Sequence, residues 1–122
     1  MSSSEPRLAA LEALYAAESV AADGPRIEGI GRRAGRLATG TWDKRVDLDL
    51  EIAGAARGWR VERMPAVDRN ILRLALYELR HTDTPVAVVI SEAVKLAKRL
   101  STTNSGSYVN GILGNLAEAD LG

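Results

Sequence analysis

Residues 65–80 read PAVDRNILRLALYELR, and this stretch decides the fold class. After the opening proline, apolar residues cover most of the circumference of a helix, whereas the polar residues gather near its start. A helix that is apolar nearly all round belongs in the centre of a bundle rather than on its surface. The stretch therefore predicts an all-α protein built around this helix.

The segments on both sides of the central stretch also show helical spacing. Apolar residues recur at intervals of three and four in further segments: 6–22, 26–39, 85–100 and 105 onward. The second of these is expected to end at Gly40, because glycine commonly terminates a helix. At 122 residues the chain is long enough to bury one core. We predict one domain, a compact bundle of about six helices.

Residues 42–57 fit two structures. Val46, Leu48, Leu50 and Ile52 alternate with acidic residues, which is typical of a half-buried strand. The same residues also fit a helix with apolar positions on two adjoining faces. We predict a helix, because the neighbouring segments are helical and one strand cannot form a sheet alone.

Composition limits the kinds of site and the compartment. The chain has no cysteine and one histidine, His81, which excludes disulfides and zinc coordination of the usual nitrogen and sulfur type. The polar start of the chain lacks the features of a signal peptide, and no stretch has the roughly 20 apolar residues that span a bilayer. We expect a soluble, cytoplasmic protein without a metal or cofactor and with no membrane contact.

Signals of an enzyme are missing from the sequence. It has no glycine-rich phosphate loop after a strand and no nucleophile elbow. Asp47, Asp49 and Glu51 lack the glycine and the closing glutamate of a calcium loop, so a solvated helix face is the better interpretation. His81 lies in a segment of turn composition and has no evident catalytic partner. We predict a protein without catalytic residues.

The charges of the later segments point to nucleic acid. Sixteen basic residues balance sixteen acidic ones, so any nucleic-acid role must use a local patch. Lys95, Lys98 and Arg99 share one helix face, and no acidic residue occurs between positions 93 and 117.

A polar segment, 101–107, follows this basic face and includes Asn104 and Ser105, whose side chains suit phosphates and base edges. Tyr108 then offers a ring on which an unpaired base can stack. Together these features favour a platform for single-stranded RNA. The alternative is an ordinary solvated face, with Tyr108 packed on Val109 or Ile112.

Several motifs resemble the NusB family. Residues 67–79, VDRNILRLALYEL, resemble its central-helix signature, and residues 85–98, PVAVVISEAVKLAK, and 108–113, YVNGIL, resemble two later motifs in the same order. The triplet Ala13-Leu14-Tyr15 is similar to the first helix of the family, and the match is strong from Trp59 to Leu113. The resemblance implies two small helical subdomains, here residues 1–58 and 59–122.

The resemblance also implies a function in transcription antitermination. Family members bind the boxA element of ribosomal RNA leaders together with the ribosomal protein NusE, and this complex, with RNA polymerase and other Nus factors, reads through terminators. Carried over by position, the RNA surface includes Arg7, Tyr15, Arg73, Asn104 and Tyr108. The NusE-facing surface includes Glu62 and Asp68, with Tyr77 and Glu78 nearby.

Two departures from the family bear on RNA binding. The family's arginine-rich start is replaced here by residues 2–7, SSSEPR, which leaves only Arg7. Lys95 and Asn104 stand where acidic residues are common in the family, and both changes favour RNA. A module that binds protein with weak or no RNA contact, and the first domain of a ribosomal RNA methyltransferase, are the alternatives. Some family members also form homodimers.

Overall fold

The computed structural model describes residues 5–58, 60–102 and 104–121, and every regular element within them is helical. The predicted all-α class is therefore confirmed. The elements in chain order are α1 (Glu5–Ser19), α2 (Arg32–Asp43), α3 (Arg45–Ala55), the 3-10 helix η1 (Val61–Arg63), α4 (Ala66–His81), α5 (Val86–Leu100) and α6 (Ser105–Leu121).

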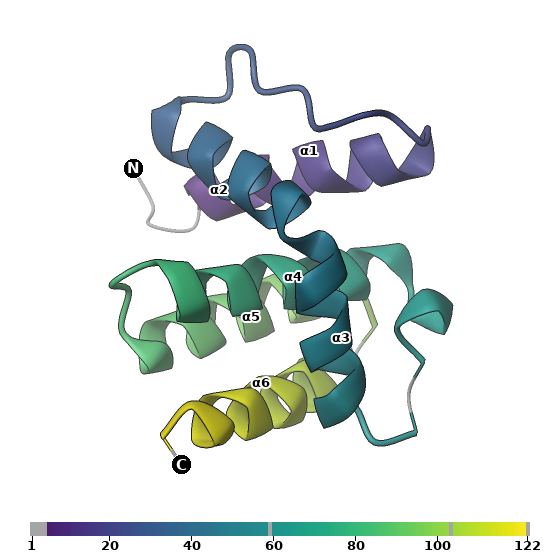
Figure 1. Ribbon diagram of the computed structural model, residues 1–122, viewed down its shortest axis with the longest axis vertical. Helices are drawn as coiled ribbons and strands as arrows, with labels where there is room; N and C mark the ends of the chain where they lie inside the picture. The colour runs from purple at the N-terminus through teal and green to yellow at the C-terminus, as the bar shows by residue number, and fades with distance from the viewer. Residues whose placement is uncertain (1–4, 59, 103, 122) are drawn as a thin grey trace.

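Helix α4 lies in the centre, as the stretch 65–80 predicts. α1 and α2 lie side by side across one end, α5 and α6 pack beneath α4, and α3 runs from α2 past α4 to α6 (Figure 1). α4 contacts all five other helices. Its Leu72 and Leu76 are completely buried. A buried leucine contributes about 1.5–3 kcal/mol, so α4 anchors the core.

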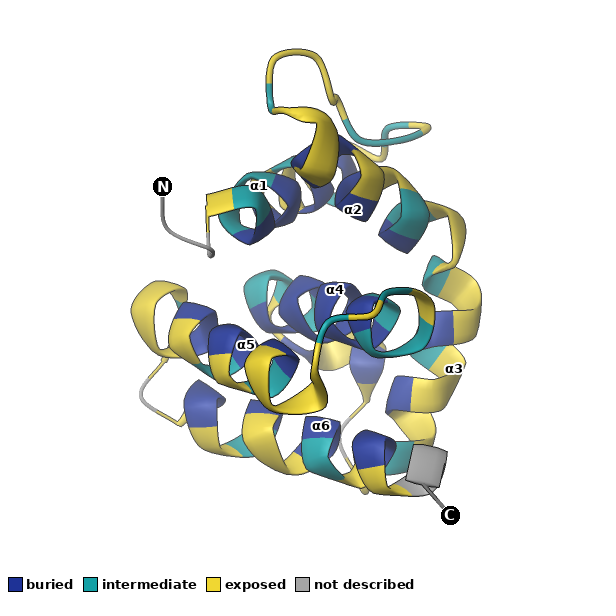
Figure 2. Cartoon of the chain, turned by 90° about the vertical axis from the view of Figure 1, so that its left-hand side faces the viewer, coloured by how far each residue is buried: buried dark blue, intermediate teal, exposed yellow. Residues whose placement is uncertain are grey.

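The buried sides of the helices face one another. Figure 2 shows the buried residues of α4, α5 and α6 turned inward, whereas the segment between α1 and α2 is mainly exposed. The buried residues of α5 include Val89, Ala93 and Leu96, which follow the spacing predicted for that segment. Among the described residues, no helix has both the length and the apolar character needed to cross a membrane.

The predicted position of the second helix is wrong. The sequence pattern favours 26–39, but α2 begins at Arg32 and continues to Asp43. Gly29 and Gly31 have φ of +80° and +97°, a backbone conformation that a right-handed helix cannot contain. The preceding residues therefore form a loop, in which Ile27 is 43% exposed.

Gly40 does not end α2 but lies inside it, where α2 crosses α4. A β-carbon at position 40 would overlap the ring of Tyr77 on α4. Glycine weakens a helix interior by about 1 kcal/mol relative to alanine. Its presence here is explained by the close approach of the Tyr77 ring.

Replacing Gly40 with alanine is expected to lower the free energy of unfolding by about 1–3 kcal/mol, because the added methyl group displaces the Tyr77 ring. In a Tyr77→Ala background the same change should stabilise the protein, by up to about 1 kcal/mol, because only helix propensity remains. Urea unfolding of the four proteins in this double-mutant cycle measures both effects. A stabilising Gly40→Ala in the presence of Tyr77 would contradict the close contact.

Helix α3 confirms the helical interpretation of residues 42–57, although Trp42 belongs to the end of α2. Leu48 and Ile52 are buried, whereas Val46 and Leu50 are 67% and 69% exposed. The alternating pattern thus combines two apolar faces, of which only one belongs to the core. α3 packs mainly on α4 and α6. The division into parts at residue 58 stays a prediction.

Candidate functional site

The predicted basic face forms on α5, beside the start of α6. Lys95, Lys98 and Arg99 are all exposed, and α5 and α6 are in extensive contact. A β-carbon at Gly106 would lie 2.8 Å from Cγ of Lys98, so the lysine stem rests on the first turn of α6. This contact holds the Lys98 ammonium group near the start of that helix.

One acidic side chain borders this face. Lys95 Nζ lies 3.8 Å from a carboxylate oxygen of Glu92, one turn earlier on α5. Lys95 is well exposed, and such a surface pair contributes little stability. Lys95 therefore stays accessible, with its charge partly balanced.

The start of α6 is fixed by a buried carboxylate of α4. Asp68 is completely buried, and its Oδ2 accepts hydrogen bonds from Tyr108 Oη and from Ser105 Oγ, the latter at 2.9 Å. Burial, together with the hydrogen bond to Asp68 and its charge, raises the pKa of Tyr108 above its ordinary value of 10. Tyr108 therefore remains a protonated donor, and its half-buried ring is held in place.

This network changes the interpretation of the polar segment 101–107. Ser105 is completely buried, so its hydroxyl belongs to the interior rather than to an RNA surface. Asp68, predicted to face a protein partner, is likewise closed to solvent. Asn104 is exposed, whereas Thr103 lies outside the described residues. Asn104 and the Tyr108 ring are the parts of this segment that extend the basic face.

Arg7 and Glu78 pair with each other in the interior. Arg7 Nε and Nη2 donate to the two carboxylate oxygens of Glu78 at 2.7 and 2.8 Å, and both residues are 2% exposed. The pair joins α1 to α4. In this structure neither the predicted RNA contact of Arg7 nor the predicted partner contact of Glu78 is open to solvent. Residues 2–4, where the family's arginines are missing, lie outside the described residues.

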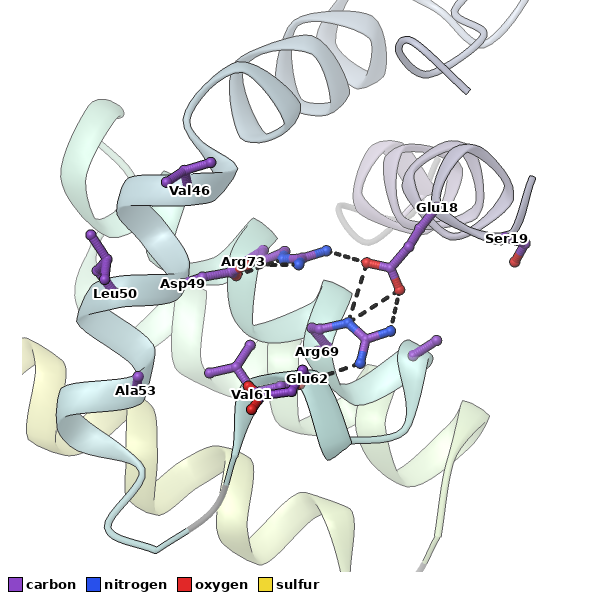
Figure 3. A pocket seen from close by; sticks show the side chains of 11 residues that line it. Glu18, Ser19, Val46, Asp49, Leu50, Ala53, Val61, Glu62, Arg69 and Arg73 are labelled. Atoms are coloured by element: carbon purple, nitrogen blue, oxygen red, sulfur yellow. Dashed lines mark hydrogen bonds and ion pairs between the residues drawn. The ribbon is translucent and has the colours of Figure 1, made fainter. Parts of the chain in front are cut away.

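Arg73 belongs to a second network, which joins α1, α3 and α4 (Figure 3). Its Nε and Nη2 each donate to Asp49 at 2.7 Å, and its Nη1 donates to Glu18, which also binds Arg69. Burial lowers the pKa of Arg73, but the hydrogen bonds and charges of Asp49 and Glu18 outweigh this effect and raise it. Arg73, predicted to contact RNA, is only 8% exposed and is held by these carboxylates.

The network forms the floor of a groove between α1, α3, α4 and η1, which we call the α3 groove. Its volume is about 770 Å³, and Val46 and Leu50 project from α3 along its edge (Figure 3). Glu62, predicted to face a protein partner, lies in this groove with its side chain exposed. The full lining is Glu18, Ser19, Val46, Asp49, Leu50, Ala53, Val61, Glu62, Ala66, Arg69 and Arg73.

Tyr15 and Tyr77, the other two tyrosines of the predicted sites, lie at different places. Tyr15 is 43% exposed on α1, one helical turn before Glu18 of the groove. Tyr77 lies between α2 and α4, where its ring is 5.0 Å from that of His81. Neither tyrosine lines the α3 groove, although Tyr15 is on the helix that supplies Glu18 and Ser19 to it.

Comparison with known proteins identifies the family. The family model described as the NusB family matches residues 4–118. The chain belongs to the NusB family. Proteins named transcription antitermination protein NusB from Frankia casuarinae and Acidothermus cellulolyticus are 44% and 45% identical over 92% and 88% of this chain and 81% of each relative. A third, from Symbiobacterium thermophilum, is 56% identical over 68% of this chain and 55% of its own length.

Solved structures agree with this membership. The fold matches T. maritima NusB with a TM-score of 0.85 and 34% identity, covering 97% of this chain and 92% of that one. A chain in the crystal structure of a plectonemic RNA supercoil matches with a TM-score of 0.83, over 97% and 95% of the two chains, but its 22% identity shows the fold alone. The NusB family is one of transcription factors and is not a known enzyme family.

The sequence patterns do not predict the roles of Glu18 and Arg69 in the network. For Arg69 the signal is the group of polar residues at the start of the otherwise apolar stretch 65–80. A charged residue at the end of a central helix needs partners from neighbouring helices, since burying it unpaired is costly. The sequence does not say which helices supply them, because this depends on how α1 and α3 cross α4.

Stability should depend on the charge of Glu18. Burial raises the pKa of Glu18, but hydrogen bonds and charges of Arg69 and Arg73 outweigh burial and lower it from the ordinary 4.5. A carboxylate with a lowered pKa stabilises the fold above its unfolded pKa and loses this contribution as pH falls through the folded pKa. Glu18→Gln should therefore destabilise the protein at pH 7, and its difference from the wild type should shrink below about pH 4.5.

Urea unfolding as a function of pH measures this difference. Glu12→Gln is the matched control, because Glu12 is an exposed residue on the same helix. The control should stay close to the wild type at every pH. A Glu18→Gln difference that is constant from pH 7 to pH 3 would show that the ionised carboxylate is not what stabilises the network.

Proposed function

We propose that this NusB-family protein is a transcription antitermination factor that binds a boxA-type RNA leader sequence together with a NusE-type ribosomal protein. In this role it helps RNA polymerase, with other Nus factors, to read through terminators, and it works in the cytoplasm as a binding protein without catalysis. The observation that carries the proposal is the basic face of α5, placed beside an exposed asparagine and a fixed tyrosine ring.

The basic face has the parts that single-stranded RNA requires. Lys98 and Arg99 suit phosphates, Asn104 suits a base edge, and the Tyr108 ring suits stacking. Because the whole chain has zero net charge, such a local concentration of positive charge matters more than it would in a basic protein. Ser105 is buried at the start of α6 and Arg7 is buried between α1 and α4, so in this proposal both stabilise the fold and neither belongs to the basic face.

The α3 groove is the surface for the protein partner in this proposal. Val46 and Leu50 expose apolar surface that the core does not use, and Glu62 adds a negative charge beside it. A basic ribosomal protein with an apolar side chain for the groove would complement both features. Tyr15, one turn from Glu18, lies where it can join this contact.

A module that binds protein and contacts RNA weakly is the second candidate. Arg7 is buried against Glu78, so it adds nothing to the basic face. RNA affinity would then come from α5 and the start of α6 alone. Such a protein would bind the NusE-type partner normally, and RNA would add nothing to the complex.

Titration with boxA-like RNA and with a scrambled RNA, each with and without the NusE-type protein, tests the proposal. We expect preference for the boxA-like RNA and tighter binding in the presence of the partner, which supplies part of the surface. Tyr108→Ala should weaken binding by about 1–3 kcal/mol at any salt concentration, because stacking is lost. The effect of Lys98→Ala should diminish as salt rises.

Tyr108→Phe is the matched control, because it keeps the ring and removes the hydroxyl that donates to Asp68. It should bind RNA nearly as the wild type does while losing some stability. Equal binding of the boxA-like and scrambled RNA, with or without the partner, would reject the proposed function. Intact partner binding without any RNA effect would favour the second candidate.

A further inference from the structure

A second group of positive charges lies on α2. Arg32, Arg33 and Arg36 are all exposed, and none of them forms an ion pair with any residue that the structure describes. Their spacing of three and four residues brings their side chains to neighbouring positions on one side of the helix. α2 packs on α1, α3 and α4 at the end of the molecule opposite α6, so this group is separate from the basic face (Figure 1).

The arginines border two adjoining hollows. The first, of about 660 Å³, is lined by Arg32 and by glycines of α2 and the loop before it. The second, of about 320 Å³, is lined by Arg33 and by residues at the end of α4. Arg36 and Tyr77 line both hollows, so the two adjoin at these side chains and together form what we call the α2 depression, with Arg32 in the lining of one hollow and Arg33 in that of the other.

The α2 depression also offers flat surfaces. The ring of His81 is exposed and packs 5.0 Å from the ring of Tyr77 at an angle of 36°. Gly29 and Gly31 leave open space on the other side, because nothing lies within 4 Å of where their β-carbons would be. Rings bordering a hollow with free guanidinium groups suit a chain that alternates phosphates with flat bases.

Within the part of the chain that the structure describes, no acidic side chain forms an ion pair with these arginines. Glu78 lines the second hollow, but its carboxylate is bound by Arg7. Glu28 and Asp83 are exposed on the flanking loops without an ion pair to the arginines within the described residues. The planar guanidinium group can donate two parallel hydrogen bonds to a phosphate, which makes arginine well suited to nucleic-acid backbones.

We propose that Arg32, Arg33 and Arg36 form a second RNA contact, which binds the backbone of single-stranded RNA extending beyond the basic face. The inference rests on the proposed function, since it requires that the chain binds RNA. An acidic segment of a protein would also pair with the arginines, but it would leave the rings and the open glycine side without a partner. RNA can contact the arginines through its phosphates and can also occupy the rings and the open glycine side.

The test compares two triple variants with the same change in charge. R32Q/R33Q/R36Q removes the α2 arginines, and R57Q/R60Q/R63Q removes three exposed arginines on and before η1, which lies on the other side of the molecule from the start of α2 (Figure 1). Both variants should unfold at the same urea concentration as the wild type within error. The probes are a short boxA-like RNA and a longer RNA that extends the same sequence at both ends.

The salt dependence of affinity is the readout, because each phosphate contact on a single strand contributes about 0.7 to the slope of log K against log salt concentration. For the longer RNA, R32Q/R33Q/R36Q should reduce this slope by about 1–2, whereas R57Q/R60Q/R63Q should reduce it much less. For the short RNA the two variants should behave alike. His81→Ala should weaken binding of the longer RNA at all salt concentrations.

Equal slopes for the two triple variants on the longer RNA would overturn the inference. It would also be overturned if R32Q/R33Q/R36Q lost affinity for an acidic peptide while its RNA binding stayed unchanged. The proposed function is decided separately, by preference for the boxA-like sequence over the scrambled one. Backbone contacts do not depend on sequence, so the slopes of the two triple variants are informative on the longer RNA whether its core is boxA-like or scrambled.

Discussion

Replacing Glu78 with glutamine is expected to lower the free energy of unfolding by about 3–5 kcal/mol, because it leaves the Arg7 charge buried without its counter-charge. Arg7 Nε and Nη2 lie 2.7 and 2.8 Å from the two oxygens of Glu78, and each residue is 2% exposed. Glutamine keeps the shape of the side chain and one acceptor oxygen but removes the charge. Urea unfolding, followed by circular dichroism at constant pH, measures the loss.

Two further variants show whether the loss comes from the unpaired buried charge or from removing an ion pair as such. The double variant Arg7→Met/Glu78→Leu should recover most of the lost stability, because apolar residues of similar volume replace a buried ion pair at little cost. Glu62→Gln is the exposed control, since Glu62 and Arg60 are 3.9 Å apart with mostly exposed side chains. Its effect should be about 0–1 kcal/mol. A Glu78→Gln effect no larger than this would contradict a buried pair.

The Arg7 pair also shows how sequence patterns mislead at charged positions. Arg7 stands four and seven residues before Leu11 and Leu14, so its side chain falls on the buried face of α1. Because arginine is rarely fully buried, its charge suggests a surface contact. Only the arrival of Glu78 from a helix distant in sequence makes the buried position favourable. No local pattern contains that information.

The helices also differ in how closely the sequence predicts them. The stretch 65–80 and the segment 85–100 predict α4 and α5 closely, because each buries a continuous apolar stripe with the period of a helix. The sequence pattern places the second helix too early, because Ile27 and Ile30 continue the helical period of apolar residues through a loop. Gly29 interrupts the helix through its backbone rather than through hydropathy.

The sequence predicts a candidate surface well when its residues lie close together in the chain. Lys95, Lys98 and Arg99 share one helix face, and the structure exposes all three. The α3 groove has no such local signature, because Val46 and Glu62 come from different elements. The alternation of apolar and acidic residues at 46–52 is the sequence signal that relates to the groove. Without knowledge of how α3 crosses α4, this alternation fits a strand equally well.

Replacing Leu50 with lysine is expected to weaken binding of the NusE-type partner by about thirtyfold or more, the equivalent of about 2 kcal/mol at an interface hot spot. Leu50 is 69% exposed at the edge of the α3 groove, so the change should alter the free energy of unfolding by no more than about 0.5 kcal/mol. Isothermal titration of the partner in the absence of RNA measures the loss.

Val86→Lys is the control, because Val86 is also an exposed apolar residue, on the first turn of α5 away from the groove. It should leave partner affinity unchanged. Sedimentation of the wild type and the Leu50→Lys variant provides the competing outcome. If the variant loses only self-association and binds the partner normally, the groove is an interface between two copies of this chain.

The effect of Leu50→Lys is expected to be large because the groove is rigid before any partner arrives. Arg73 is bound on one side by Asp49 of α3 and on the other by Glu18 of α1, so the position of α3 relative to α1 is fixed. A preorganised surface avoids the entropy cost of ordering on binding, so its apolar contacts appear more fully in the affinity. Glu18→Gln, which weakens this network, should therefore reduce partner affinity although every exposed apolar residue of the groove is unchanged.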